Sequence, residues 1–354
     1  MNLRYLTVST APSDELLELL NNNIIGTPGQ SMLYQHLGVN EKIGKIKNPY
    51  FLNLERSGHI AGTACFCKRV TRTRANAATS FYVRYFSFKD IFRRKSASVR
   101  LQQKPSVIRE EVNRVLGGEK LDVQHGEKFL HYAYVDTRNE RSAVLCREFG
   151  FEPVRQYTTL TFSRLFPKTS NVYKIVELDA AIVQPLLQEF YGEFSLVSFA
   201  NLQGNKYYFL ENNDGKRIAG VQVNPDEWKI HSLPGFFMNS LIGVFSATPI
   251  LNRILSKRFR FLTFENFYWA PGNENCLETL LEHLLAKYKV NTGLCIVDRE
   301  SKMFNVLKSL KLGVLNRINK EVAGDVICRF ENFSDSEKSV FKNTPAYISG
   351  IDAT

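Results

Sequence analysis

HYAYVDTRNERSAVLCREFGF, residues 131–151, is the stretch that decides how the chain folds. Residues 131–135 are mostly apolar and predict a short buried strand. A polar turn follows at 136–139, and residues 141–149 place apolar side chains at helical spacing. Gly150 then ends the helix, because glycine readily adopts the left-handed backbone conformation found at helix ends. Phe151 begins another strand, so the stretch predicts a strand, a turn, a helix and a strand in succession.

The spacing within this stretch carries more information than its composition. Asn139, Ser142, Leu145, Gly150 and Phe151 fall at offsets 0, 3, 6, 11 and 12. This pattern resembles the N-x-x-A-x-x-L-Y-x-x-x-G-F signature of the GNAT superfamily of acyl-CoA-dependent N-acyltransferases. In that family the strand, turn and helix lie against the acyl-CoA. The resemblance therefore implies an acyl-CoA site beside residues 131–151.

Length and composition are those of a soluble globular protein with two domains. The chain has 354 residues, 44% of them hydrophobic and 23% charged, and a mean hydropathy of −0.22. Two domains of about 150–170 residues would accommodate this length. No apolar run is long enough to cross a membrane. Asp14, Glu15 and Glu18 interrupt the N-terminal apolar residues, so we expect neither a secretory signal nor a membrane partner.

The six cysteines predict a reducing compartment and no metal site. They lie mostly in apolar strand or helix contexts. Cys65 and Cys67 share a strand face, but no second pair completes the spacing of a zinc site. We therefore expect reduced and mostly buried thiols, no bound metal, and a cytoplasmic protein.

The chain repeats itself at a separation close to half its length. Ile60-Ala61-Gly62 and Ile218-Ala219-Gly220 each follow a strand and a polar turn, and they lie 158 residues apart. The helical segment 107–116 has a counterpart at 277–287, and 131–151 has a weaker one at 294–313. Similar offsets in the same order indicate a duplicated domain.

We therefore expect the α+β class, with two tandem GNAT-like domains. Each is a mostly antiparallel twisted sheet flanked by helices and completed by its own closing strands. The expected boundaries are 1–166 and 171–332, with a linker near Pro167. The remaining segment, 333–354, is polar and predicts a partly disordered tail.

Positive charge is concentrated in residues 68–104. This segment holds eleven lysines and arginines against a single acid, Asp90. Such a field attracts polyanions. The phosphates of coenzyme A, nucleic acid and an acidic lipid surface would all satisfy it, and a solvated basic loop would also explain it.

The end of this basic segment resembles the phosphate loop of the family. The family pattern is a strand ending in V-x-P, followed by R/Q-x-x-G-x-G/A at the start of a helix. Phe88 and Asp90 take the Val and Pro places, and both glycines are serines. Serine still offers a backbone N–H and adds a hydroxyl donor, although its Cβ hinders close approach. The cofactor-binding residues implied by the resemblance are Phe86, Ser87, Phe88, Arg93, Arg94, Lys95, Ser96, Ser98 and Asn139.

The second half matches the family in its strand but not in its loop. Glu265 to Pro271, ENFYWAP, looks like the family's E-x-L-x-V-x-P strand end. The loop that follows is short and lacks Arg, and Glu274 and Glu278 would repel a phosphate. The expectation is therefore that the first half binds acyl-CoA and that the second supplies a carboxylate and helps to form the acceptor site.

Acyl transfer to an amine requires a base, an oxyanion site and an acid for the leaving thiolate. In the family a strand carboxylate often serves as the base, and Glu265 is the best candidate here because burial would raise its pKa. The tyrosine that often serves as the general acid in the family is replaced by Cys146 in the first half. His131 begins the strand that would flank the thioester and is a third catalytic candidate. Tyr132, Tyr134 and Tyr157 are alternative proton donors, and their spacing in the sequence does not favour any one of them.

Three functions remain open at this stage. The first is an N-acyltransferase that moves an acyl group from acetyl-CoA, or a longer acyl-CoA, to an amine on a small molecule, peptide or protein. The second is a catalytically inactive GNAT-fold binding or regulatory protein, which the serines in the loop and the missing Tyr favour. The third is a nucleic-acid-binding protein that uses segment 68–104 and its interleaved aromatic residues.

Overall fold

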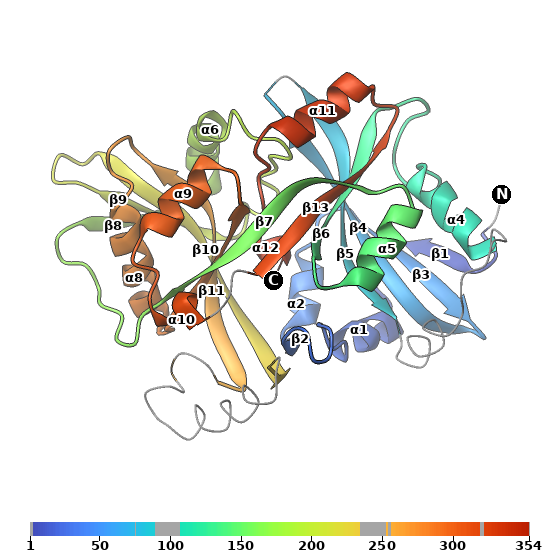
Figure 1. Ribbon diagram of the computed structural model, residues 1–354, viewed down its shortest axis with the longest axis horizontal. Coiled ribbons are helices and arrows are strands. Elements are labelled where there is room, and N and C mark those ends of the chain that lie inside the picture. Colours follow the sequence, from blue (N-terminus) through green and yellow to red (C-terminus); the bar gives the residue numbers. More distant parts are fainter. Residues whose placement is uncertain are drawn as a thin grey trace.

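The computed structural model describes residues 3–74, 76–88, 107–233, 253, 256–318 and 322–353. Its strands form one 13-stranded sheet that runs through both halves of the molecule, with helices packed along it (Figure 1). Neighbouring strands are mostly antiparallel. The mixed class, the largely antiparallel sheet and its flanking helices are as the sequence predicts.

The first half contains the elements expected from its sequence. The stretch 131–151 forms a strand, a turn and a helix that ends before Gly150, and a new strand follows. The elements of this half are β1 (Leu6–Ser9), α1 (Asp14–Asn21), β2 (Leu33–His36), α2 (Val39–Gly44), β3 (Pro49–Arg56), β4 (His59–Arg72), β5 (Ala77–Phe88), α4 (Val107–Leu116), β6 (Phe129–Asp136), α5 (Glu140–Glu148) and β7 (Glu152–Ser163).

The second half repeats this succession, except that it has no counterparts of β2 and α2 and contains the additional helix α10. Two further helices follow its last strand. Its elements are β8 (Lys174–Leu178), α6 (Ala180–Phe190), β9 (Lys206–Glu211), β10 (Arg217–Ser232), β11 (Arg258–Trp269), α8 (Cys276–Tyr288), β12 (Thr292–Asp298), α9 (Lys302–Ser309), α10 (Val314–Ile318), β13 (Val322–Glu331), α11 (Asp335–Asn343) and α12 (Gly350–Ala353).

The two halves exchange their closing strands, which the sequence analysis did not predict. The first half-sheet runs β1-β3-β4-β5-β6 and the second β8-β9-β10-β11-β12. β13, from the second half, completes the first half-sheet beside β6, and β7, from the first half, completes the second beside β12. β7 and β13 also pair with each other, and they cross the middle of the molecule side by side (Figure 1). The boundaries at 166 and 171 remain a prediction.

Local sequence signals explain where the key helices begin and end. The side chain of Asn139 accepts a hydrogen bond from the N–H of Ser142 (3.2 Å) and so caps α5. Gly150 has a φ of +76° just past the end of α5, as its position predicts. Ser301 caps α9 in the same way as Asn139, accepting from the N–H of Phe304 (3.1 Å).

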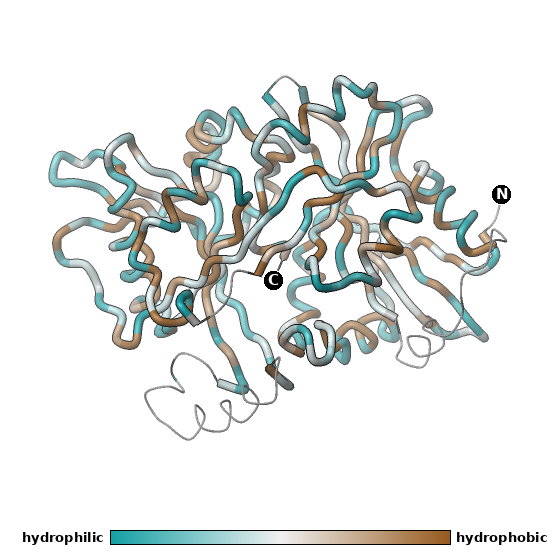
Figure 2. Tube along the Cα trace, viewed as in Figure 1, coloured by the Kyte–Doolittle hydropathy of each residue, from teal (hydrophilic) through white to brown (hydrophobic). Residues whose placement is uncertain are grey.

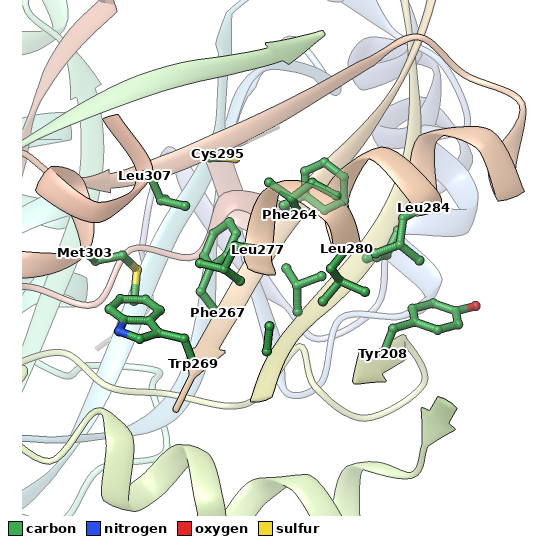
Figure 3. Close-up of a cluster of buried hydrophobic side chains, with 14 of the residues drawn as sticks. Tyr208, Phe264, Phe267, Trp269, Leu277, Leu280, Leu284, Cys295, Met303 and Leu307 are labelled. Atoms are coloured by element: carbon green, nitrogen blue, oxygen red, sulfur yellow. The ribbon is translucent and has the colours of Figure 1, made fainter. Parts of the chain in front are cut away.

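Hydrophobic side chains cover both faces of the sheet. In the second half, Leu277, Leu280 and Leu284 of α8 pack on the aromatic residues of β11, including Phe264 and Phe267 (Figure 3). In the first half, one apolar cluster lies between the sheet and α1 and α2, and another between the sheet and α4 and α5. Hydrophobic residues follow the strands, whereas the outermost loops are largely hydrophilic (Figure 2).

The segment after Asn332 is ordered as far as Ala353, so the expectation of partial disorder is wrong. It forms α11 and α12, and residues 346–350 are buried. α12 lies near the middle of the molecule, beside the C-terminal end of the chain (Figure 1). A polar composition misleads here because the segment's polar side chains, Ser349 and Asp352, have buried partners.

The described residues hold six free cysteines, four of them fully buried. No helix among these residues is long and apolar enough to span a membrane. They also contain no group of three His, Cys, Asp or Glu side chains placed to hold a metal ion.

Candidate active site

The parallel strands β5 and β6 separate partway along their length. They pair from Thr79–Phe129 to Tyr82–Tyr132 and no further. Beyond that point β5 stays with β4, and β6 stays with β13. The backbone groups on the facing edges of the two strands are therefore no longer paired across the sheet.

A β-bulge lies directly beyond this separation. Tyr85 has a φ of +54°, and the register between β4 and β5 shifts there, between Thr63 and Cys65. A positive φ is uncommon for any residue except glycine, and bulges redirect the side chains and backbone groups that follow them. The sheet thus has an irregular edge where the two strands part.

The second half has the same strand separation and the same bulge. β11 and β12 pair only from Leu262–Gly293 to Phe264–Cys295. Asn266 has a φ of +53°, with a register shift against β10 between Gly220 and Gln222. Each half of the chain therefore contains a separation of two parallel strands with a β-bulge beside it.

Tyrosine side chains occupy the second of these two separations. The hydroxyl of Tyr207 donates to the carbonyl of Asn266 (2.8 Å), and that of Tyr191 donates to the carbonyl of Phe267 (3.1 Å). Tyr347 donates to the side-chain oxygen of Asn266 (2.8 Å). At Tyr85, the first-half counterpart of Asn266, no side chain within the described ranges donates to the carbonyl. The two halves therefore differ in how their strand separations are filled.

Glu265 lies at the second separation, next to α12. Its side chain is buried, and Oε2 accepts hydrogen bonds from the hydroxyl of Ser349 (2.8 Å) and the N–H of Ile351 (3.0 Å). Oε1 is also buried and has no hydrogen-bond partner. Burial raises the pKa of the carboxyl to about 7, with a further contribution from the charge of Asp352. A small cavity adjoins the carboxyl and is lined also by Asp298, Ser301 and Tyr347.

Ser349 connects Glu265 to the first half. Its hydroxyl binds the carboxylate, while its N–H donates to the hydroxyl of Tyr134 (3.2 Å). Tyr134 lies on β6 two residues beyond the last pair with β5. Its pKa is raised by burial and by neighbouring groups, first among them Tyr132, so the phenol keeps its proton. This link joins a carboxyl on β11 to a phenol beside the first separation.

His131 and Cys146 lie on the opposite face of the sheet. Alternate residues of a strand point to opposite faces, so His131 points away from the side that carries Tyr132 and Tyr134. His131 is fully buried against Phe81, its Nε2 is 2.8 Å from the carbonyl of Leu116, and burial lowers its pKa to about 3. Cys146 packs into the same cluster, where burial raises its pKa to about 11. The structure does not bring either residue together with Glu265.

The residues expected to bind the cofactor are only partly described. Phe86 is 47% exposed, whereas the side chain of Ser87 is buried. Phe88 ends β5, and Asn139 caps α5. The phosphate-loop residues lie outside the described part of the chain: Arg93, Arg94, Lys95, Ser96 and Ser98.

Sequence reasoning missed most of the polar groups around Glu265. Ser349 and Asp352 belong to the segment expected to be a disordered tail. Arg69 and Arg84 appeared only as part of the basic segment, but Arg69 forms a bidentate ion pair with the buried Asp352. The sequence did contain a signal for these buried charges. Arg69 and Arg84 lie within strands that are otherwise rich in apolar residues, and an arginine at such a position predicts a buried charge with a partner.

The strand order, the two strand separations and the two bulges together define a fold of the GNAT type, with the same arrangement in each half of the chain. Solved structures with this architecture superpose along nearly the whole chain. A structure of Saccharomyces cerevisiae N-myristoyltransferase with bound myristoyl-CoA is similar, with a TM-score of 0.57 and 12% identity over 94% of this chain and 84% of that one. A GCN5-related N-acetyltransferase from Kribbella flavida is also similar, with a TM-score of 0.50 and 9% identity over 92% of this chain and 71% of that one.

No protein-family model and no curated protein matches the sequence. At 9–12% identity, the structural likeness establishes the fold and leaves the activity to be argued from the site.

Proposed function

We propose that the protein is an acyl-CoA-dependent N-acyltransferase whose acyl-CoA binds in the first half. One observation carries this proposal: β5 and β6 separate beside the bulge at Tyr85, whereas tyrosines fill the equivalent separation of the second half. The reaction is transfer of an acetyl or longer acyl group to an amine on a small molecule, peptide or protein. The six free cysteines favour a cytoplasmic location.

The separated strands suit the pantetheine arm of the co-substrate. The edges of β5 and β6 that face each other beyond Tyr82 and Tyr132 offer backbone donors and acceptors to an extended chain. β5 leads directly into the basic segment 89–104, which would receive the phosphates. The thioester would then lie near the bulge, within reach of backbone N–H groups that stabilise an oxyanion.

Glu265 and Tyr134 are the two groups we assign to proton transfer. The amine nitrogen attacks the thioester carbon, and Glu265, directly or through water, takes the proton that the amine loses. The tetrahedral intermediate then collapses, the carbon–sulfur bond breaks, and Tyr134 donates a proton to the departing thiolate. A carboxyl with a pKa of about 7 is suited to accept a proton at neutral pH. His131 and Cys146 have no part in this scheme.

Calorimetric titration with acetyl-CoA and with longer acyl-CoAs tests the proposal. The wild-type protein is compared with a variant in which Arg93, Arg94 and Lys95 are all changed to Ala. A matched control changes three exposed cations of the second half: Lys216, Lys229 and Lys311. We expect one-site binding that the first variant loses and the control keeps. Absence of binding to every acyl-CoA would refute the proposal.

The two other functions predict different results. An inactive binding protein would bind acyl-CoA but release no coenzyme A with any amine. A nucleic-acid-binding protein would show affinity that falls steeply with salt. Of the aromatic residues in the basic segment, Phe81 and Tyr82 are buried and cannot stack on bases, whereas Phe86 is exposed.

A further inference from the structure

Three polar atoms without hydrogen-bond partners cluster at the bulge of β5. Within the described ranges, seven buried side-chain nitrogen or oxygen atoms lack a partner. Three of the seven belong to residues 84–87: Nε of Arg84 and the hydroxyl oxygens of Tyr85 and Ser87. Buried polar groups in folded proteins are nearly always hydrogen-bonded, so such a concentration in one short segment requires an explanation.

Arg84 also lacks a full counter-charge. Its guanidinium stacks over the ring of Tyr85 (4.3 Å to the centroid), and its side chain is 11% exposed. Its ion-pair partner among the described residues is Asp352, whose carboxylate oxygen lies 3.5 Å away. Asp352, however, is already bound by both terminal nitrogens of Arg69 and by the side chain of Asn201 (2.9 Å). One carboxylate therefore serves two buried guanidinium groups.

The surrounding charges do not correct this imbalance. Lys42 is paired with the buried Asp226 at 2.6 Å. His36 contacts Lys42, and burial and neighbouring cations lower its pKa, so it is neutral. Among the described residues, Arg84 has no ion pair other than the one it shares with Arg69 at Asp352, and a buried cation with only a shared counter-charge favours the arrival of an anion.

We propose that Arg84, with the hydroxyls of Tyr85 and Ser87, binds a carboxylate of the acceptor, so that the acceptor is an amine of the α-amino-acid type. The inference rests on the proposed function, because the bulge is also where the thioester would lie. A guanidinium edge that includes Nε matches the two oxygens of a carboxylate, and the hydroxyls can donate to the same group. Since Arg84 is two residues beyond the last β5–β6 pair, the amine and the carboxylate must be close together in the acceptor.

Cys67 is the competing explanation for the missing negative charge. Its sulfur lies 3.8 Å from that of Cys65, and the hydrogen bond from Cys65, followed by the charges of Arg69 and Arg84, lowers the pKa of the Cys67 thiol. A Cys67 thiolate would neutralise Arg84 without any ligand. The change Cys67→Ser separates the two explanations, because it removes the thiolate and leaves the guanidinium edge in place.

The first test compares the common α-amino acids with their α-amides as acceptors for acetyl-CoA, with release of coenzyme A as the readout. The wild-type protein should prefer at least one acid over its amide by ~100-fold or more, because the amide leaves the guanidinium without an anion. Arg84→Met should abolish this preference, and Arg84→Lys should weaken it. The control Arg74→Met removes a cation that is 74% exposed and should keep the preference.

Thermal unfolding supplies a second readout that does not depend on catalysis. The same acids, but not their amides, should raise the unfolding temperature of the wild-type protein and fail to do so for Arg84→Met. Without ligand, Arg84→Met should unfold at or above the wild-type temperature, because it removes an uncompensated charge.

The outcomes distinguish this inference from the proposed function. If acyl-CoA binds but acids and amides are equal in both readouts, the carboxylate site is refuted and the acyltransferase proposal stands. If acyl-CoA does not bind but acids still stabilise the protein through Arg84, the site stands and the acyltransferase proposal fails. If the wild-type protein shows no preference for acids and Cys67→Ser creates one, the thiolate is the counter-charge of Arg84 and the site is refuted for the wild-type protein.

Discussion

At the scale of the residue, environment rather than residue type separates the three catalytic candidates. Burial raises the pKa of Glu265 to about 7, although the hydrogen bonds from Ile351 and Ser349 to its Oε2 act in the opposite direction. His131 is buried in an apolar cluster and is neutral at all ordinary pH values. Cys146 is partly buried at the edge of the apolar cluster between the sheet and α4 and α5, and burial raises its pKa to about 11. Of the three candidates, only Glu265 combines a pKa suited to proton transfer with a carboxyl oxygen that has no hydrogen-bond partner.

Replacing Glu265 tests this assignment through pH dependence. We expect kcat/KM of the wild-type protein to rise with pH through about 7 as Glu265 loses its proton. Glu265→Gln should lower kcat by ~100-fold or more and remove this rise. The same raised pKa predicts that wild-type stability falls as pH increases from about 4.5 to about 7, because the unfolded carboxyl ionises first. An unchanged pH profile in the glutamine variant would refute the role of Glu265.

His131 has the opposite sign of pH dependence. Because its folded pKa is lowered to about 3, its contribution to stability is lost as pH falls from about 6.5 toward 3. Urea unfolding of His131→Phe should therefore show a smaller loss of stability between pH 7 and pH 4.5 than the wild type. Activity at pH 7.5 should stay within about 2-fold, since the imidazole takes no part in proton transfer. A large loss of activity with unchanged stability would return His131 to the catalytic scheme.

At the scale of the element, the end of β7 is held by a turn from the other half. The N–H of Ser163 donates to the carbonyl of Leu312 (2.8 Å), and its hydroxyl accepts from the N–H of Leu315 (3.2 Å). Gly313 sits between these contacts with a φ of +95°, and a Cβ there would overlap the carbonyl oxygen of Ser163. This turn fixes the exchanged strand in the second half.

Two glycine substitutions separate backbone strain from loss of this contact. Gly150 and Gly313 both have a positive φ, but a Cβ on Gly150 would meet only a side-chain carbon of Arg329 at 4.0 Å. Gly150→Ala should cost ~1–2 kcal/mol, the price of a left-handed conformation alone. Gly313→Ala should cost ~3 kcal/mol or more, because steric overlap adds to that strain. Equal losses in urea unfolding would show that the contact with Ser163 does not hold the strand.

At the scale of the whole molecule, the exchange of β7 and β13 makes each half depend on the other. β6 lacks one neighbour without β13, and β12 lacks one without β7. An isolated half would expose these strand edges together with the apolar residues beside them. The segment 345–353 adds a further link, since it binds Glu265 of the second half and Tyr134 of the first.

Separate expression of the halves tests this dependence. Residues 1–170 and 171–354 should each fail to unfold cooperatively when made alone, and co-expression should recover a folded complex. The intact chain should show a single transition that is coincident by fluorescence and circular dichroism. Cooperative unfolding of either isolated half would contradict the expectation.

The sequence by itself determined the local elements, the duplication and the candidacy of Glu265. Helix caps, turn glycines and apolar periodicity act over a few residues. The strand–turn–helix at 131–151 and the repeated Ile-Ala-Gly strands can therefore be predicted without a structure. The basic segment and the two serines in the glycine places of the loop are visible in the same way.

Only the tertiary structure decided which strands pair across the halves and which polar groups meet. The exchange of β7 and β13 follows from contacts between residues at least 129 positions apart, such as Ser163 and Thr292 or Arg155 and Val326, and no local pattern encodes them. Ser349 and Asp352 are polar residues in a polar segment, so their burial beside Glu265, Arg69 and Arg84 depends on partners far away in the chain. Pairing of this kind is set by packing of the whole molecule, because a buried charge is stable only where distant residues supply its counter-charge.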